Sequence, residues 1–150
     1  MPHTYSNLLT HAVFSTKDRL RTITEPMRND LHAYLGGIIR ELGGTTVIVG
    51  GIEDHVHLLL ALPTELPIAE CLRVVKGSSA KWVHEKWPER RTFGWQRGYA
   101  AFSVSASNAA AVSEYIRNQV EHHRKRSFED EFKALLRRHG IGFEDRFLWS

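Results

Sequence analysis

The order of hydrophobic patterns along the chain limits its fold more than any other feature. Four runs have the character of strands, and two runs with apolar side chains at helical spacing lie between them. The strand-like runs are residues 6–14, 45–49, 52–62 and 99–105. The helical runs are residues 24–42 and 67–87. The order β-α-β-β-α-β predicts an α+β, ferredoxin-like (RRM-like) fold, in which an antiparallel sheet carries helices on one face.

Two further helices are expected after the sheet. Ser107 can cap a helix that continues through Lys125, and Ser127 begins a last helix with Asp130 in a capping-box arrangement. These helices must cover part of the open face of the sheet, extend beyond it, or dock on a partner. We expect Gly50-Gly51 to form a turn or a bulge between the second and third strands. No repeat or linker interrupts the pattern, so we expect a single domain over residues 1–150.

The composition is that of an ordinary soluble protein, with 42% hydrophobic and 25% charged residues. No run approaches the roughly 20 apolar residues of a membrane span, so we expect a protein without membrane attachment. The lone Cys71 falls in an apolar helical pattern and has no partner for an internal disulfide. A buried, inert thiol and a cytoplasmic location are therefore expected.

Basic and aromatic side chains are interleaved between residues 73 and 97. Seven basic residues stand there against two acidic ones, although the net charge of the whole chain is only +3. Basic side chains bind phosphates and aromatic rings stack on bases, so this pattern is typical of proteins that bind a nucleic-acid strand. The alternative is a solvated helix with tryptophans in the core. The best candidates for DNA contacts are Arg73, Lys76, Lys81, Trp95 and Arg97.

His55-Val56-His57 lies inside the third strand-like run. Side chains alternate in a strand, so Val56, Leu58 and Leu60 point to the helices while both histidines point to the other face. Residues i and i+2 lie roughly 6.6 Å apart along a strand, close enough for two imidazoles to converge on one ion. The alternative is a pair of polar residues at the wet edge of the strand.

Tyr115 and Gln119 are spaced i, i+4 and would lie on one side of a helix. Phenolate at pH 7 costs about 4 kcal/mol, which a divalent cation or a lysine must offset if Tyr115 acts as a nucleophile. Taken alone, each of these residues has a structural explanation. Two imidazoles with an amide oxygen would form a neutral ligand set, which suits Mg²⁺ or Mn²⁺ and leaves the full charge of the ion for a phosphate. Without a carboxylate, such a site is expected to bind metal weakly in the absence of DNA.

The chain resembles the single-tyrosine HUH transposases of bacterial insertion sequences, a family that includes the REP-associated tyrosine transposases. The resemblance runs through nearly the whole chain, and its motifs occur in the family's order. The matching segments are residues 11–19, 54–59, 76–79, 95–99 and 115–119.

The resemblance implies that Tyr115 is the nucleophile and that His55, His57 and Gln119 hold a divalent metal. It further implies cleavage of single-stranded DNA beside hairpins, a 5′-phosphotyrosine intermediate, rejoining by a 3′-hydroxyl, and a homodimer whose active sites form within or between subunits. Three alternatives remain: a non-catalytic, domesticated binder of hairpin DNA or RNA, a replication-initiator or relaxase-like nickase, and an unrelated small metalloprotein. The intact set of four residues argues against a pure binder, and the short chain argues against a nickase. An unrelated metalloprotein would leave the basic segment unexplained.

Overall fold

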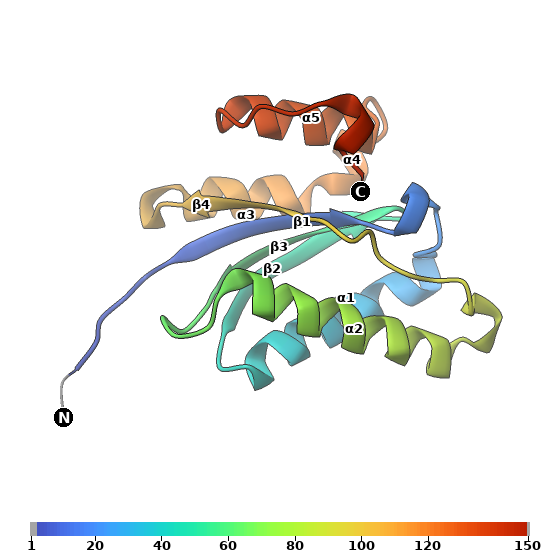
Figure 1. The fold of residues 1–150 in the computed structure, drawn as a ribbon, viewed down its shortest axis with the longest axis horizontal. Coiled ribbons are helices and arrows are strands. Elements are labelled where there is room, and N and C mark those ends of the chain that lie inside the picture. Colours follow the sequence, from blue (N-terminus) through green and yellow to red (C-terminus); the bar gives the residue numbers. More distant parts are fainter. Residues whose placement is uncertain (1–2, 150) are drawn as a thin grey trace.

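The computed structural model describes residues 3–149 and has the expected β-α-β-β-α-β order followed by helices (Figure 1). The strands are β1 (Leu9–Ser15), β2 (Thr45–Ile52), β3 (His55–Ala61) and β4 (Ala100–Val104). The α-helices are α1 (Glu25–Glu41), α2 (Ile68–Lys86), α3 (Ala109–Arg117), α4 (Gln119–His122) and α5 (Phe128–Arg138). The strands form one antiparallel sheet in the order β2-β3-β1-β4, which confirms the ferredoxin-like prediction.

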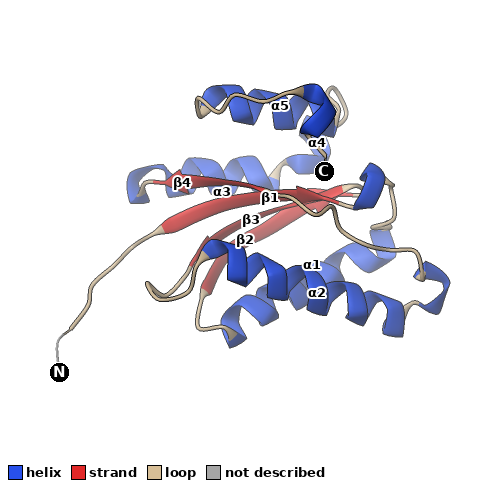
Figure 2. Cartoon of the chain, in the orientation of Figure 1, coloured by secondary structure: helices blue, strands red, loops and turns tan. Residues whose placement is uncertain are grey.

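Helices α1 and α2 cover one face of the sheet (Figure 2). The predicted stripe of Val56, Leu58 and Leu60 points into this layer and is fully buried there. It packs with apolar side chains of α1 and α2, among them Leu35 and Leu72. The period of two in β3 therefore places its apolar side chains in the main core, as the alternation predicts.

Helices α3, α4 and α5 lie on the opposite side of the sheet (Figure 1). A second apolar cluster there joins Val13 and Phe102 of the sheet to Phe128 and Phe132 of α5. The helices that follow the sheet thus cover its open face instead of extending beyond it. The last of them is capped as expected, since the backbone N–H of Asp130 donates to Ser127 Oγ at 3.1 Å.

Gly50 and Gly51 do not form the turn that the sequence suggested. Strand β2 continues through both glycines to Ile52, and the hairpin turn follows at residues 53–54. The irregularity in pairing lies earlier, between Thr46 and Ile48. Gly50 is needed for a different reason: a Cβ there would stand 2.5 Å from the carbonyl oxygen of Ile116, so α3 rests directly on the backbone of β2.

The expected helix from Ser107 to Lys125 is interrupted at Asn118. Helix α3 ends at Arg117, Asn118 has non-helical dihedral angles, and α4 then runs from Gln119 to His122. Ile116 is fully buried against the sheet, whereas Val120 is half exposed. The apolar contact between this segment and the sheet therefore ends where the helix is broken.

Candidate metal centre

Strand β3 carries His55 and His57 to the face covered by α3, α4 and α5. Both side chains are fully buried, and the stacked ring of Phe128 lies 3.9 Å from that of His55, centroid to centroid. The neighbours Val56 and Leu58 point the other way into the main core. The same alternation that fills the core therefore directs both imidazoles into the second layer.

The outer nitrogen of each imidazole is hydrogen-bonded in the way that metal-binding histidines require. Nδ1 of His55 lies 2.8 Å from Oδ1 of Asp54, and Nδ1 of His57 lies 2.8 Å from Nε2 of His11. With a metal bound, each Nδ1 would donate outward and each Nε2 would present its lone pair to the ion, whereas in the metal-free protein an Nε2–H donates to Glu131 instead. A carboxylate or imidazole acceptor behind a ligating ring also fixes its orientation.

Both Nε2 atoms point at the carboxylate of Glu131 from α5. Oε1 of this carboxylate lies 3.3 Å from Nε2 of His55, 3.0 Å from that of His57 and 3.2 Å from that of His123. The ligand atoms of His55, His57 and Glu131 all lie within 4.8 Å of one another. Ligand atoms about 2.1 Å from an ion in an octahedral shell stand about 3.0 Å apart, so these separations fit a divalent metal.

The predicted residues Tyr115 and Gln119 reach the same point from α3 and α4. Oε1 of Gln119 lies 2.8 Å from Nε2 of His55, and its Nε2 donates to Oε2 of Glu131 at 2.9 Å. The hydroxyl of Tyr115 donates to the same oxygen of Glu131. The structure therefore brings all four predicted residues together within one chain, with Glu131 between the tyrosine and the histidines.

Burial sets the ionisation of the histidines that surround this carboxylate. It lowers the pKa of His57, and together with the neighbouring His57 it lowers the pKa of His11 to about 3. Burial also opposes protonation of His55, but hydrogen bonds to Asp54 and Glu131 outweigh it and raise the pKa of His55. Of the two histidines proposed as ligands, His57 is therefore held neutral, the form that binds a metal, whereas His55 must give up a proton to bind one.

The pKa values of Glu131 and Tyr115 shift in opposite directions. Burial would raise the pKa of Glu131, but hydrogen bonds from His123, His55 and His57 hold it far below its usual range. Burial and the charge of Glu131 raise the pKa of Tyr115 well above that of free tyrosine. Glu131 is thus an anion and Tyr115 a neutral phenol in the metal-free protein.

The sequence reasoning missed Glu131, His123 and His11. Glu131 corrects the expectation of a neutral ligand set, because it adds a buried carboxylate to the two imidazoles. One signal could have found it: Glu131 stands at helical spacing between Phe128 and Leu135, on the apolar face of α5. A glutamate at a core position is almost never left without a partner.

A wide, open cavity of about 700 Å³ lies beside the centre and reaches Asp54, His123 and Phe128. Its wall mixes basic side chains from η1 (Lys17–Arg19), from α1 and from the segment after α4. The basic residues are Arg19, Arg21, Arg28, Arg124, Lys125 and Arg126. Five carboxylates share the cavity: Asp18, Glu53, Asp54, Glu129 and Asp130. The cavity therefore places six basic groups and five carboxylates beside the buried centre.

The five candidates for DNA contacts lie away from the metal centre, toward the other face of the sheet. Four of them, Arg73, Lys76, Trp95 and Arg97, line one pocket between α2 and residues 95–99. Lys81 is exposed on α2 and does not line this pocket. Trp95 is only partly exposed, and its indole N–H donates to Ser79 Oγ at 2.9 Å.

The structure also bears on the expectations for the thiol and the membrane. Cys71 is buried in the main core, and burial raises its pKa to about 11, as an inert thiol requires. Within residues 3–149, every helix is too short or too polar to span a bilayer.

Comparison with known proteins places these residues in a family context. The family model described as "Transposase IS200 like" matches residues 4–119. The transposase for insertion sequence element IS200 of Salmonella typhimurium is 26% identical over 126 residues, covering 81% of this chain and 82% of the relative. The ISDra2 transposase TnpA of Deinococcus radiodurans is 25% identical over 114 residues, covering 73% of this chain and 81% of the relative.

Two solved structures share the fold. One is a Deinococcus radiodurans R1 protein assigned as a transposase, with a TM-score of 0.65, 25% identity, and coverage of 79% of this chain and 96% of that one. The other is a REP-associated tyrosine transposase bound to a REP hairpin, with a TM-score of 0.61, 12% identity, and coverage of 82% and 74%. Glu131 and His123 lie beyond the residues that the family model matches.

Proposed function

Since the chain belongs to the IS200-like transposase family, we propose that it cleaves and rejoins single-stranded DNA beside hairpins through a covalent 5′-phosphotyrosine intermediate. One observation carries the proposal: the Tyr115 hydroxyl and the Nε2 atoms of His55 and His57 meet on a single carboxylate, that of Glu131. A nucleophile and a metal site are then close enough to act on one phosphodiester.

In the proposed reaction, the Tyr115 oxygen attacks the scissile phosphorus and the bond from phosphorus to the 3′ oxygen breaks. The phenol releases its proton to solvent, the 5′ phosphate remains on the tyrosine, and the 3′ oxygen takes a proton from water and leaves as a hydroxyl. A phenolate is a better leaving group than an alkoxide, so a DNA 3′-hydroxyl reverses the step and joins the strands. His55, His57, Glu131 and Gln119 would hold Mg²⁺ or Mn²⁺, which supplies positive charge to the phosphate and to the phenolate.

The residues of the chain prepare this chemistry in two ways. Asp54 and His11 keep the Nε2 atoms of the two histidines directed inward. Glu131 orients the Tyr115 hydroxyl, and the Gln119 amide holds the same carboxylate in place. The raised pKa of Tyr115 means that added positive charge is needed before it becomes a strong nucleophile.

The partner is proposed to be hairpin-bearing single-stranded DNA. A structural relative was solved with a REP hairpin, and the arginines and Lys125 in the cavity beside the centre are available to contact a phosphate backbone. We also propose that the protein works as a homodimer, as the resemblance implies. Since one chain supplies both Tyr115 and the histidines, each subunit can hold a complete site. Sedimentation with and without hairpin DNA measures the assembly.

Replacing the tyrosine tests the nucleophile. Tyr115→Phe should lower covalent protein–DNA adduct formation by at least about 1000-fold, because no other group replaces the phenol oxygen. Adducts are measured on denaturing gels with end-labelled hairpin oligonucleotides, and binding by anisotropy should stay within about twofold. Tyr34→Phe, in the helix layer on the other face, is the matched control. An adduct that persists in Tyr115→Phe would overturn the assignment.

Chelation tests the metal. EDTA should abolish adduct formation, and Mg²⁺ or Mn²⁺ in excess should restore it, because the charge of the ion is needed to form the phenolate. Cleavage that persists in EDTA would contradict the proposed metal site. If the unmodified protein binds hairpin DNA but forms no adduct with either ion, the non-catalytic binder is the correct function.

A further inference from the structure

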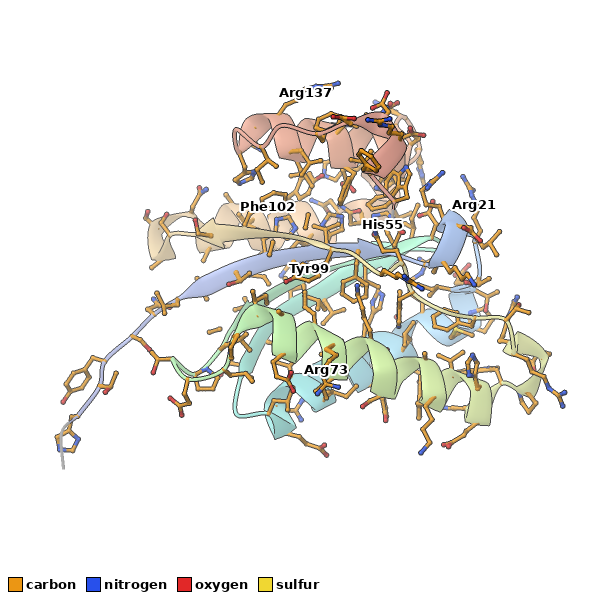
Figure 3. The ribbon with its side chains drawn as sticks, in the orientation of Figure 1. Arg21, His55, Arg73, Tyr99, Phe102 and Arg137 are labelled. Atoms are coloured by element: carbon orange, nitrogen blue, oxygen red, sulfur yellow. The ribbon has the colours of Figure 1, made fainter. Side chains whose placement is uncertain are left out.

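A second pocket lies far from the metal centre, between α2 and the segment that leads into β4. It has a volume of about 350 Å³ and is lined on one side by α2 and on the other by residues 95–99. The ring of Tyr99 forms part of its wall and is 37% exposed, although β4 itself begins at the next residue. Arg73 and Tyr99 are both labelled in Figure 3. The pocket therefore combines an accessible aromatic ring with cationic side chains.

Lys76 shapes this pocket from within. Its Nζ donates to the carbonyl oxygens of Gln96 at 3.0 Å, Arg97 at 3.2 Å and Gly98 at 2.5 Å. It also lies 5.5 Å from the centroid of the Tyr99 ring, and burial lowers its pKa to about 8. Lys76 thus holds the 96–98 backbone and one face of Tyr99, so its role is to build the pocket rather than to contact a phosphate.

The remaining cations stand at the mouth. Arg97 is exposed, and Arg73 is 70% exposed with an ion pair to Glu70 at 2.6 Å. An exposed ion pair of this kind contributes at most about 1 kcal/mol, so Arg73 can exchange Glu70 for a phosphate. Two exposed guanidinium groups beside a ring match the composition of sites that hold single nucleotides by stacking and by phosphate contacts.

Helix α2 has no side chain facing the pocket at Gly77. A Cβ on Gly77 would meet no atom within 4 Å, and its φ is not in the left-handed region. Packing and backbone geometry therefore do not require a glycine here, and glycine costs a helix about 1 kcal/mol relative to alanine. Ala69 and Ala80 line the same wall with small side chains. The small side chains of this wall therefore leave the α2 side of the pocket open.

The pocket is also tied to the strand that holds the metal centre. Gln96 lines the pocket, and its Oε1 accepts a hydrogen bond from the backbone N–H of Ser15 at 2.7 Å. Ser15 is the direct pairing partner of His55 in the sheet. Strand β4 is the edge of the sheet on this side, so the pocket lies beside an open edge of the sheet that carries the metal centre.

We propose that the pocket between α2 and residues 95–99 binds one unpaired nucleotide of the DNA substrate, with the base stacked on Tyr99 and the phosphate on Arg97 and Arg73. The proposal rests on the proposed function, since it names a second binding point for the same DNA. It assigns Lys76 and Trp95, which the sequence analysis expected to touch DNA, to positioning the loop that carries Tyr99.

Filling the pocket tests the proposal. Gly77→Leu places a side chain into it while improving the helix propensity of α2, and Gly37→Leu is the matched control in α1, where a Cβ also meets no atom within 4 Å. Two fluorescein-labelled probes are compared by anisotropy: a DNA stem-loop with an eight-nucleotide thymidine extension, and the same stem-loop with a blunt end. Gly77→Leu should weaken binding of the extended probe by about 5- to 100-fold and leave the blunt probe unchanged.

A second pair of variants distinguishes loss of base stacking from a general disturbance of the structure around the pocket. Tyr99→Ala should weaken binding of the extended probe to a similar degree, whereas Tyr99→Phe, which keeps the ring, should bind as the unmodified protein does. Equal effects of Gly77→Leu and Gly37→Leu would overturn the proposal, as would a loss that is the same for both probes. If the unmodified protein forms its Tyr115 adduct and these variants bind normally, the pocket proposal fails while the proposed function stands. If it binds neither probe, both fail.

Discussion

The two faces of the sheet are built from the same strands, yet they hold opposite kinds of side chain. On the α1 and α2 face, Val56, Leu58 and Leu60 of β3 are buried among apolar neighbours. On the α3 to α5 face, His55 and His57 of the same strand are equally buried but surround an anion. Burial alone therefore does not distinguish a core from a site; what the buried group contacts does.

This difference between the faces indicates which one stabilises the fold and which one is suited to bind a ligand. The apolar face gains free energy from each buried methyl group, at about 25 cal/mol per Å² of apolar surface. The polar face buries an ionised carboxylate and several imidazoles, an arrangement that is costly to desolvate and is offset only by their mutual hydrogen bonds. Substitutions on the first face should change unfolding, and those on the second should change ligand binding.

The largest expected effect belongs to the apolar face. Leu58→Ala should lower the free energy of unfolding by about 3 kcal/mol, because Leu58 is fully buried and truncation leaves a cavity. Urea denaturation followed by circular dichroism measures it. Val47→Ala, at a strand position that is 48% exposed, should change the same quantity by less than about 0.5 kcal/mol. A small effect at Leu58 would mean that this face is not the main core.

A somewhat smaller effect is expected on the polar face, and in a different quantity. Glu131→Gln should weaken Mn²⁺ binding by the DNA-free protein by about 10- to 100-fold, because the site loses its only anion among the proposed ligands. Isothermal titration calorimetry measures the affinity. Glu129→Gln, on the exposed side of α5 and paired with Lys133, is the control. Equal Mn²⁺ affinity in Glu131→Gln and the unmodified protein would exclude Glu131 as a ligand.

The smallest expected effect is on the pH dependence of stability, and it comes from a polar side chain in the helix layer of the apolar face. Nε2 of His32 in α1 is buried without a hydrogen-bond partner, and burial together with Arg28 lowers the pKa of His32 to about 4. As the pH falls below about 6.5, the unfolded chain takes up the proton first, so stability is lost between pH 7 and pH 4.

His32→Gln removes this titration. The loss of unfolding free energy between pH 7 and pH 5 should shrink by about 1 kcal/mol, a value reduced for the partial exposure of the side chain. Urea denaturation at the two pH values measures it, with the same substitution at the exposed His3 as control. An unchanged pH dependence would show that His32 is hydrated in solution.

The features that the sequence predicted correctly are those that depend on local periodicity. The stripe in β3, the cap at Ser127 and the order of strands and helices follow from spacing within short segments. The features that it missed depend on contacts between distant segments. Glu131 lies 74 residues from its partner His57, and nothing within α5 reveals which imidazoles it will meet. The role of Gly50 is likewise set by a helix more than 60 residues later.

The contact at Gly50 also determines how reproducibly the tyrosine is placed. Where α3 lies on β2, the lack of a side chain at Gly50 lets both the carbonyl oxygen and the Cγ2 methyl group of Ile116 approach the strand. Any side chain at Gly50 would therefore push α3 away from the strand. Tyr115 is one residue before this contact, so its registry against the histidines should tolerate repacking elsewhere in the molecule. Substitutions in the layers around this contact should therefore leave the position of the Tyr115 oxygen unchanged.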